Sequence, residues 1–185
     1  MTKPLIRYND RDVFIMALTL YGEARGLDLE GQTKVAWVIR NRAERRAFVG
    51  SSWLGTEGAV AKVCLMPWQF SCWNDGDPNS GRLHTWLDEF DRRGGANMEI
   101  LPFINLATSV LEGLVEDITN GADHYHTVRA PSWAQSWPPT WAKAYGVVAC
   151  DTIVDGDGET IADPRGHVFY SSLVKPGEKS ASIPS

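Results

Sequence analysis

Two helical patterns joined by a very short turn constrain the fold of this chain more than any other feature. Apolar residues recur at helical spacing over about residues 11–25, and a second pattern runs from Asp28 to about residue 46. Asn9 or Asp10 can cap the first helix, and Asp28 can cap the second. Because so few residues join them, the two helices are expected to form a helical hairpin. The residues expected to face the core are Val13, Phe14, Ala17, Leu18 and Tyr21 in the first helix, and Leu29, Gln32, Val35, Ala36, Ile39 and Ala43 in the second.

The corner of this hairpin carries the sequence Y-G-E-A-R-G, residues 21–26. Gly26 is well placed to end the first helix in a left-handed conformation. Glu23 then falls in the last turn, where the helix dipole is negative and where Leu20 and Tyr21 provide apolar surroundings. Both effects disfavour an ionised carboxylate, which is the condition that a general acid needs near neutral pH. The alternative is a purely structural Glu23 that pairs with Arg25 or with an arginine of the next helix.

The rest of the chain predicts shorter helices followed by a small sheet. Helices are expected over residues 58–65, 82–93 and 100–119, with Gly121 just past the end of the last one. Residues 68–73 have the composition of a strand, and residues 74–81 predict a turn. Further short strands are expected within residues 123–127, 143–150 and 167–170. The sequence therefore predicts a mainly helical α+β fold.

Composition excludes several classes of protein. A chain of 185 residues fits one domain, and its net charge of -5 argues against a general nucleic-acid binder. Its apolar runs are too short for a membrane span. Cys64, Cys72 and Cys150 lack C-x-x-C spacing and predict reduced thiols, although a Cys64–Cys72 or Cys72–Cys150 bridge stays open.

Eight tryptophans are the unusual feature of the composition. An indole ring packs well in a core, and its face is also a platform on which the C–H face of a sugar can stack. Trp37 lies on a helical stripe and is expected in the core. A proline-rich segment contains three more, Trp133, Trp137 and Trp141. Core packing explains this cluster less well, which favours a binding role there.

Four segments stand out in order along the chain: Y-G-E-A-R-G with the run E-G-Q-T-K-V-A-W-V-I-R-N-R at residues 30–42, M-P-W-Q-F-S at residues 66–71, His124, Tyr125 and His126 with Pro131, Ser132 and Trp133, and G-H-V-F-Y at residues 166–170. In this order they resemble the SleB-type cell-wall hydrolases, which include the spore-cortex-lytic and related peptidoglycan-cleaving enzymes. Met66 departs from the family pattern, which usually has glutamine there. The resemblance implies a lysozyme-like catalytic domain over residues 1–174, with a small antiparallel sheet flanking a substrate groove and a flexible tail at residues 175–185.

The same resemblance implies roles for individual residues. Glu23 stands where the family has its catalytic acid, beside Tyr21 of the motif. Gln69 and Ser71 would offer hydrogen bonds to the sugar, with Phe70 between them. Aromatic and histidine side chains would line or support the cleft. The implied substrate-binding residues are Tyr21, Gln69, Phe70, Ser71, Tyr125, His126, Trp133, His167 and Tyr170. An equal alternative for Gln69 is ordinary strand alternation, with Phe70 in the core and its neighbours solvated.

The resemblance also implies a reaction. Cleavage of a glycosidic bond needs a proton donor and usually a second carboxyl group, but the family motifs mark only Glu23. A lytic transglycosylase needs one glutamate, because the 6-hydroxyl of the muramic acid attacks its own anomeric carbon. The expected reaction is therefore non-hydrolytic cleavage of the β-1,4 bond between N-acetylmuramic acid and N-acetylglucosamine, without a cofactor. A hydrolytic muramidase and a non-catalytic wall-binding module are the alternatives on the glycan side.

Metal chemistry is the competing enzyme hypothesis. His124 and His126 would project to one face of a strand, and His84, His167 or an aspartate could complete a zinc site suited to a wall amidase. No H-E-x-x-H pattern supports such a site. The acidic segments at residues 75–79 and 155–159 predict tight turns rather than calcium loops.

The remaining expectations concern partners and location. Arg40, Arg42, Arg45 and Arg46 predict a solvated basic face on the second helix, which can attract an anionic polymer. The partner is expected to be the peptidoglycan glycan strand, with no nucleic acid or membrane, and the protein is expected to be a monomer. The first residues lack the apolar core of a secretory signal. We therefore expect a bacteriophage endolysin or virion enzyme that stays in the host cytoplasm until lysis, or a chain recorded without its leader.

Overall fold

The computed structural model describes residues 6–127, 148–151, 153–154, 160–161 and 167–172. The chain divides into two compact units, residues 1–116 and 117–185. The first unit is helical and the second contains small antiparallel sheets, so the predicted mainly helical α+β fold is confirmed. In the described residues no helix is both long and apolar enough to span a membrane. The tryptophan-rich segment with Trp133, Trp137 and Trp141 and the predicted tail at 175–185 lie outside the described residues.

The predicted helical hairpin is present. Helix α1 spans Asp10–Ala24 and helix α2 spans Leu29–Ala43. Asn9 caps α1 in a reciprocal capping box with Asp12, and the Asp28 side chain accepts a bond from the backbone of Gly31 at the start of α2. Both caps satisfy backbone N–H groups that a helix start would otherwise leave without partners.

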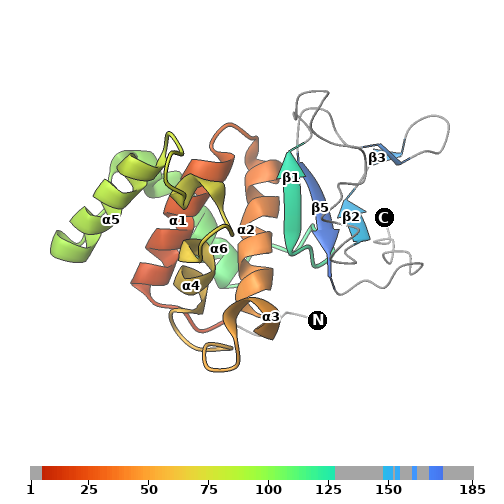
Figure 1. Ribbon diagram of the computed structural model, residues 1–185, viewed down its shortest axis with the longest axis horizontal. Helices are drawn as coiled ribbons and strands as arrows, with labels where there is room; N and C mark the ends of the chain where they lie inside the picture. Colours follow the sequence, from red (N-terminus) through yellow and green to blue (C-terminus); the bar gives the residue numbers. More distant parts are fainter. Residues whose placement is uncertain (1–5, 128–147, 152, 155–159, 162–166, 173–185) are drawn as a thin grey trace. The chain divides into compact units, whose positions relative to one another are not determined.

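Helix α1 is the centre of the first unit. Figure 1 shows it in red, with α2, α4 (Ala59–Leu65) and α6 (Leu101–Leu111) packed around it. All five residues predicted for its buried face are buried, and so is every other residue from Asp12 to Tyr21. The second helix agrees less well, because Leu29 is 69% exposed. The remaining helices of this unit are α3 (Arg46–Val49), η1 (Ser71–Trp73), α5 (Ser80–Arg93) and η2 (Met98–Ile100).

Three sequence predictions about the secondary structure of this unit are wrong. Residues 68–73 do not form a strand; they make a turn followed by the 3-10 helix η1. The late helix ends at Leu111 rather than near residue 119, because Gly113 takes a left-handed φ of 73° just beyond it. Gly26 is not left-handed: α1 ends at Ala24, and the Leu27 backbone N–H donates to the Ala24 carbonyl in the turn that follows.

Buried charged groups connect the helices. Asp12 is fully buried, and its carboxylate accepts the backbone N–H groups of Gly58 and Ala61, both at 2.8 Å, at the start of α4. Arg40 is also fully buried; it donates to the Val110 carbonyl of α6 and pairs with Glu44 at 2.9 Å. Arg42, 6% exposed, donates to the Gln69 carbonyl. The predicted solvated basic face is therefore wrong for Arg40 and Arg42, whose several donors reach neighbouring segments inside the unit.

The second unit contains a three-stranded antiparallel sheet in the order β1–β5–β2. Its strands are β1 (His124–Thr127), β5 (His167–Ser171) and β2 (Val148–Asp151), close to the predicted ranges. A separate pair joins β3 (Ile153–Val154) to β4 (Thr160–Ile161). Buried Asp123, just before β1, accepts bonds from the Ser172 backbone and hydroxyl, which ties β1 to the end of β5.

Candidate active site

Glu23 lies in the last turn of α1, as predicted, and its side chain is half-buried. Its Oε1 atom accepts two hydrogen bonds, one from Ser71 Oγ at 3.0 Å and one from the backbone N–H of Cys72 at 2.8 Å. Both donors belong to η1, which is separated from Glu23 by nearly fifty residues of chain. The carboxyl group is thus held in one orientation by a hydroxyl and an amide, and the exposed Ser71 marks the side that solvent reaches.

Close packing of η1 against α1 makes this arrangement possible. Gly22 has no side chain at the contact, and a Cβ added there would lie 2.5 Å from Cys72 Cβ and 2.8 Å from its Sγ. On the next turn of α1, buried Thr19 accepts a bond at 2.9 Å from Trp73 Nε1 and donates to the Ile15 carbonyl at 2.8 Å. The residues on both sides of Cys72 N–H are therefore fixed to α1, and the amide is aimed at Glu23.

Cys72 is a free, buried thiol, and so is Cys64, so the Cys64–Cys72 bridge left open by the sequence is not formed. Burial raises the pKa of the Cys72 thiol strongly, and the negative charge of Glu23 raises it further. Burial likewise raises the pKa of Cys64 to about 12. A thiol is a nucleophile only as the thiolate. Neither cysteine is therefore suited to nucleophilic chemistry at neutral pH, which leaves the Glu23 carboxyl group as the candidate for chemistry at this place.

Residues 66–70 lead into η1 and contain two predicted contact residues. The Gln69 carbonyl accepts from Arg42 Nη1 at 3.1 Å, and the Gln69 side chain is half-buried. Phe70 is 2% exposed, with the Arg42 guanidinium 4.9 Å from its ring centre. Phe70 thus supports the loop from the core side. Direct contact of Gln69 with substrate stays a prediction.

Tyr21 is near Glu23 in sequence but points to another side of α1. Two residues along a helix correspond to about 200° of rotation. Its ring is buried against Trp86 and Phe103, and its hydroxyl donates to Glu99 and accepts from Arg82 Nη1 at 2.9 Å. Tyr21 therefore packs α1 against its neighbours, and contact of Tyr21 with substrate stays a prediction.

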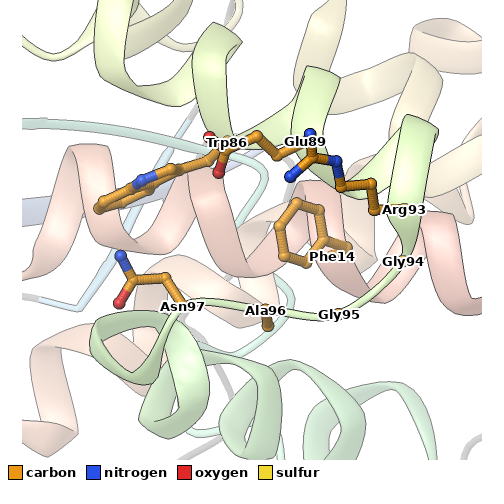
Figure 2. Close-up of a pocket in the computed structure, with 8 residues that line it drawn as sticks. All are labelled: Phe14, Trp86, Glu89, Arg93, Gly94, Gly95, Ala96 and Asn97. Atoms are coloured by element: carbon orange, nitrogen blue, oxygen red, sulfur yellow. The ribbon is translucent and has the colours of Figure 1, made fainter.

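A cavity of about 410 Å³ lies on that other side of α1 (Figure 2). The rings of Phe14 and Trp86, the side chains of Glu89 and Arg93 and the loop from Gly94 to Asn97 surround it. Phe14 precedes Glu23 by nine residues, which is about 13 Å along the helix axis and half a turn around it. The cavity is therefore separate from the Glu23 site.

Four further predicted site residues, Tyr125, His126, His167 and Tyr170, lie in two pairs on the sheet of the second unit. His126 Nε2 is 3.0 Å from the Tyr170 hydroxyl, and the two rings are stacked. Tyr125 contacts His167 edge to face, with ring centres 4.9 Å apart. The strand register puts Tyr125 opposite Phe169 and His126 opposite Val168, so the two pairs lie on opposite faces of the sheet. Burial raises the pKa of Tyr170, which keeps its phenol protonated in the bond to His126.

Comparison with protein-family models gives the deciding observation for the identity of the chain. The model described as Cell Wall Hydrolase matches residues 26–148, well over half of the sequence. The chain belongs to the SleB-type cell wall hydrolase family. Membership supports a peptidoglycan-degrading enzyme. The match includes residues 66–71 but begins three residues after Glu23, so the assignment of Glu23 depends on the Y-G-E-A resemblance and on the geometry above. Comparison with curated proteins and with solved structures gave no match.

The two histidines predicted as zinc ligands on one strand, His124 and His126, have other partners. His124 Nδ1 is 2.8 Å from Asp123 Oδ1, and His126 is bonded to Tyr170. Across the described ranges, no three His, Cys, Asp or Glu residues gather as a metal site would require. The acidic segment at 75–79 is a turn, as predicted, with Asp77 Oδ1 accepting from the backbone and side-chain nitrogens of Asn79. Residues 155–159 lie outside the described part of the chain.

Two features that position the Glu23 carboxyl group were not predicted from the sequence. Cys72 contributes a backbone N–H, which any residue except proline carries, so residue type gives no signal. Gly22 belongs to the Y-G-E-A motif, but its importance appears only when the Cβ clash with Cys72 is known. The motif order did bring Ser71 next to Glu23 as expected.

Proposed function

We propose that this cell wall hydrolase is a lytic transglycosylase that cleaves the β-1,4 bond between N-acetylmuramic acid and N-acetylglucosamine, with Glu23 as its acid and base. The observation that carries the proposal is the Glu23 carboxyl group at the end of α1, held through Oε1 by Ser71 and the Cys72 amide. Such fixing matters because a proton donor acts efficiently only when it is held within hydrogen-bond reach of the atom that it protonates.

One carboxyl group can serve both halves of this reaction. Protonated Glu23 gives its proton to the glycosidic oxygen as the bond from that oxygen to C1 of the muramic acid breaks. The 6-hydroxyl of the same muramic acid then bonds to C1, and the Glu23 carboxylate takes the hydroxyl proton. The products are a 1,6-anhydromuramic end and a free 4-hydroxyl on N-acetylglucosamine. Glu23 ends in its starting protonation state, and no water is consumed.

The surroundings of Glu23 are compatible with this double use. The Cys72 thiol beside it stays neutral because its pKa is raised, so it adds no charge that would compete with the glutamate. Oε1 is the oxygen on which both donors converge, which orients the plane of the carboxyl group. Hydrolytic glycosidases instead need a second carboxyl group at a set distance to handle water or the sugar carbon, and the family motifs mark no such residue.

We propose Gln69 and Ser71 as hydrogen-bonding contacts for the sugar substituents next to the cleaved bond. Tyr125, His126, His167 and Tyr170 of the second unit, with Trp133, are proposed as the aromatic part of the glycan-binding surface. Action from the host cytoplasm or from a virion stays a prediction from the sequence.

Digestion of purified sacculi followed by mass spectrometry of the soluble products tests the proposal. The expected products are muropeptides with 1,6-anhydro ends. Reducing muramic acid ends would show a hydrolytic muramidase instead. Free stem peptides, released in a reaction that chelators stop, would show a zinc amidase. Binding to sacculi without any soluble fragment would show a wall-binding module.

A further inference from the structure

Trp68 differs from the other tryptophans that the structure describes. Trp37 and Trp73 are at most 9% exposed, Trp86 is half-buried against Tyr21, and Trp53 is 39% exposed with Lys62 over its ring. Trp68 is 84% exposed, and it makes no ring or cation–π contact with another described residue. A side chain that stays in water on folding contributes no hydrophobic stabilisation, so packing does not explain a tryptophan at this position.

The backbone of Trp68 is also unusual. The Gln69 N–H donates to the Met66 carbonyl, which closes a four-residue turn with Pro67 in its second position and Trp68 in its third. Trp68 has a φ of 68°, and the only other non-glycine described residue with a positive φ is Asn120. This is the pattern of a type II turn, where glycine is favoured in the third position and asparagine is tolerated. Tryptophan here holds a strained conformation, and such residues concentrate at functional sites.

The turn is firmly attached on its inner side. Buried Arg42 donates to the Gln69 carbonyl and lies over the ring of buried Phe70, directly after the turn. Ser71 follows and donates to Glu23 Oε1. Trp68 and Ser71 are three residues apart, so their Cα atoms are within roughly 10 Å of each other. A few linked pyranose rings span that distance. The indole is therefore exposed on a fixed turn that leads, within three residues, to the Ser71 hydroxyl bound to Glu23.

We propose that Trp68 is a stacking platform for an N-acetylhexosamine ring of the glycan strand, a few sugars away from the bond that Glu23 cleaves. An indole face packs on the apolar C–H face of a pyranose and needs no charge to do so. A display position next to the reactive carboxyl group favours a sugar of the same strand over any other apolar partner. This inference rests on the proposed function, because it assumes that the strand lies across Glu23.

Binding of stem-free glycan strands, prepared by amidase treatment of peptidoglycan, measures the effect directly. The full chain carrying Glu23→Gln serves as the non-cleaving background, and titration calorimetry gives the dissociation constant. Adding Trp68→Ala is expected to weaken binding about tenfold, as truncation of an exposed aromatic anchor does. Trp68→Phe should recover most of the affinity. Trp53→Ala is the matched control, since Trp53 is also a surface tryptophan, and it should leave the dissociation constant unchanged.

Trp68→Gly separates binding from folding. Glycine relieves the positive φ, so this variant should unfold at a temperature equal to or above that of the parent while binding glycan as weakly as Trp68→Ala. Unchanged affinity in Trp68→Ala and Trp68→Gly would overturn the inference, as would an equal loss in Trp53→Ala. Loss of self-association or of lipid-vesicle binding without loss of glycan binding would also overturn it. If the wild type cleaves sacculi while the Trp68 variants bind normally, the inference alone fails; if the wild type releases no fragments, the proposed function fails.

Discussion

Asp12 and Glu23 lie on the same face of α1, eleven residues apart, near opposite ends of the helix. Their surroundings show how a carboxyl group that stabilises the fold differs from one that a substrate can reach. Asp12 is fully buried, and its two oxygens accept backbone N–H groups of Asn9, Gly58 and Ala61. Glu23 is half-buried, and one oxygen accepts both a hydroxyl and an amide from η1. Both carboxyl groups thus accept hydrogen bonds from residues that follow the hairpin in the chain and pack on α1: Gly58 and Ala61 at one end, Ser71 and Cys72 at the other.

The difference lies in exposure and in the kind of donor. A buried carboxylate surrounded by amides that have no other acceptor contributes to folding, because its removal leaves those amides unsatisfied. A half-buried carboxyl group beside an exposed serine is reachable by a substrate. The same type of interaction therefore attaches α4 at one end of α1 and orients the Glu23 carboxyl group, our proposed catalytic residue, at the other.

Removal of Asp12 is expected to have the largest effect on stability. Asp12→Ala leaves three backbone N–H groups without their acceptor and should lower the free energy of unfolding by about 3–5 kcal/mol. Urea denaturation measures this change. Asp10→Ala is the matched control, because exposed Asp10 is in the same first helical turn and its loss should cost less than about 1 kcal/mol. Equal losses of unfolding free energy in the two variants would show that the buried Asp12 contacts do not stabilise the fold in the way proposed.

Gly22→Ala is expected to damage both stability and activity. The new Cβ would overlap Cys72, so η1 must move away from α1 and the Cys72 amide must leave Glu23. We expect a loss of about 1–3 kcal/mol in unfolding free energy and at least about tenfold in the rate of muropeptide release. Gly81→Ala in α5 is the control, since a Cβ there meets nothing within 4 Å and should stabilise that helix slightly. Normal activity in Gly22→Ala would show that the η1 contact does not position Glu23.

Ser71→Ala is expected to have the smallest effect. It removes the hydroxyl donor to Glu23 Oε1, while the Cys72 amide remains. Release of muropeptides should slow about three- to tenfold, and the melting temperature should change little because Ser71 is exposed. Ser71→Thr retains the hydroxyl and should restore most of the rate. If Ser71→Ala lowers stability as much as Asp12→Ala, Glu23 and Asp12 have the same structural role.

The sequence predicted the parts of this fold that depend on local patterns. Helical periodicity and the Asn9 and Asp28 caps located the hairpin. The Y-G-E-A-R-G motif placed Glu23 in the last turn of α1, and the motif order placed Ser71 next to it. The burial of Arg40 and Arg42 was not predictable, because their acceptors, the Val110 and Gln69 carbonyls, come from distant segments. The turn at Trp68 was not predicted for two reasons. Residues 68–73 have the composition of a strand, and tryptophan rarely adopts the positive φ that this turn requires.

The most direct test of the account compares Glu23→Gln with the wild type in release of 1,6-anhydromuropeptides from sacculi. Glutamine keeps the size of the side chain and an acceptor oxygen for Ser71 and Cys72 but cannot transfer a proton. The melting temperature of the variant should lie within a few degrees of the wild type, and its release rate should be at least about 1,000-fold lower, toward the upper end of what a positioned acid and base contributes. A folded Glu23→Gln protein that releases anhydromuropeptides at the wild-type rate would contradict it.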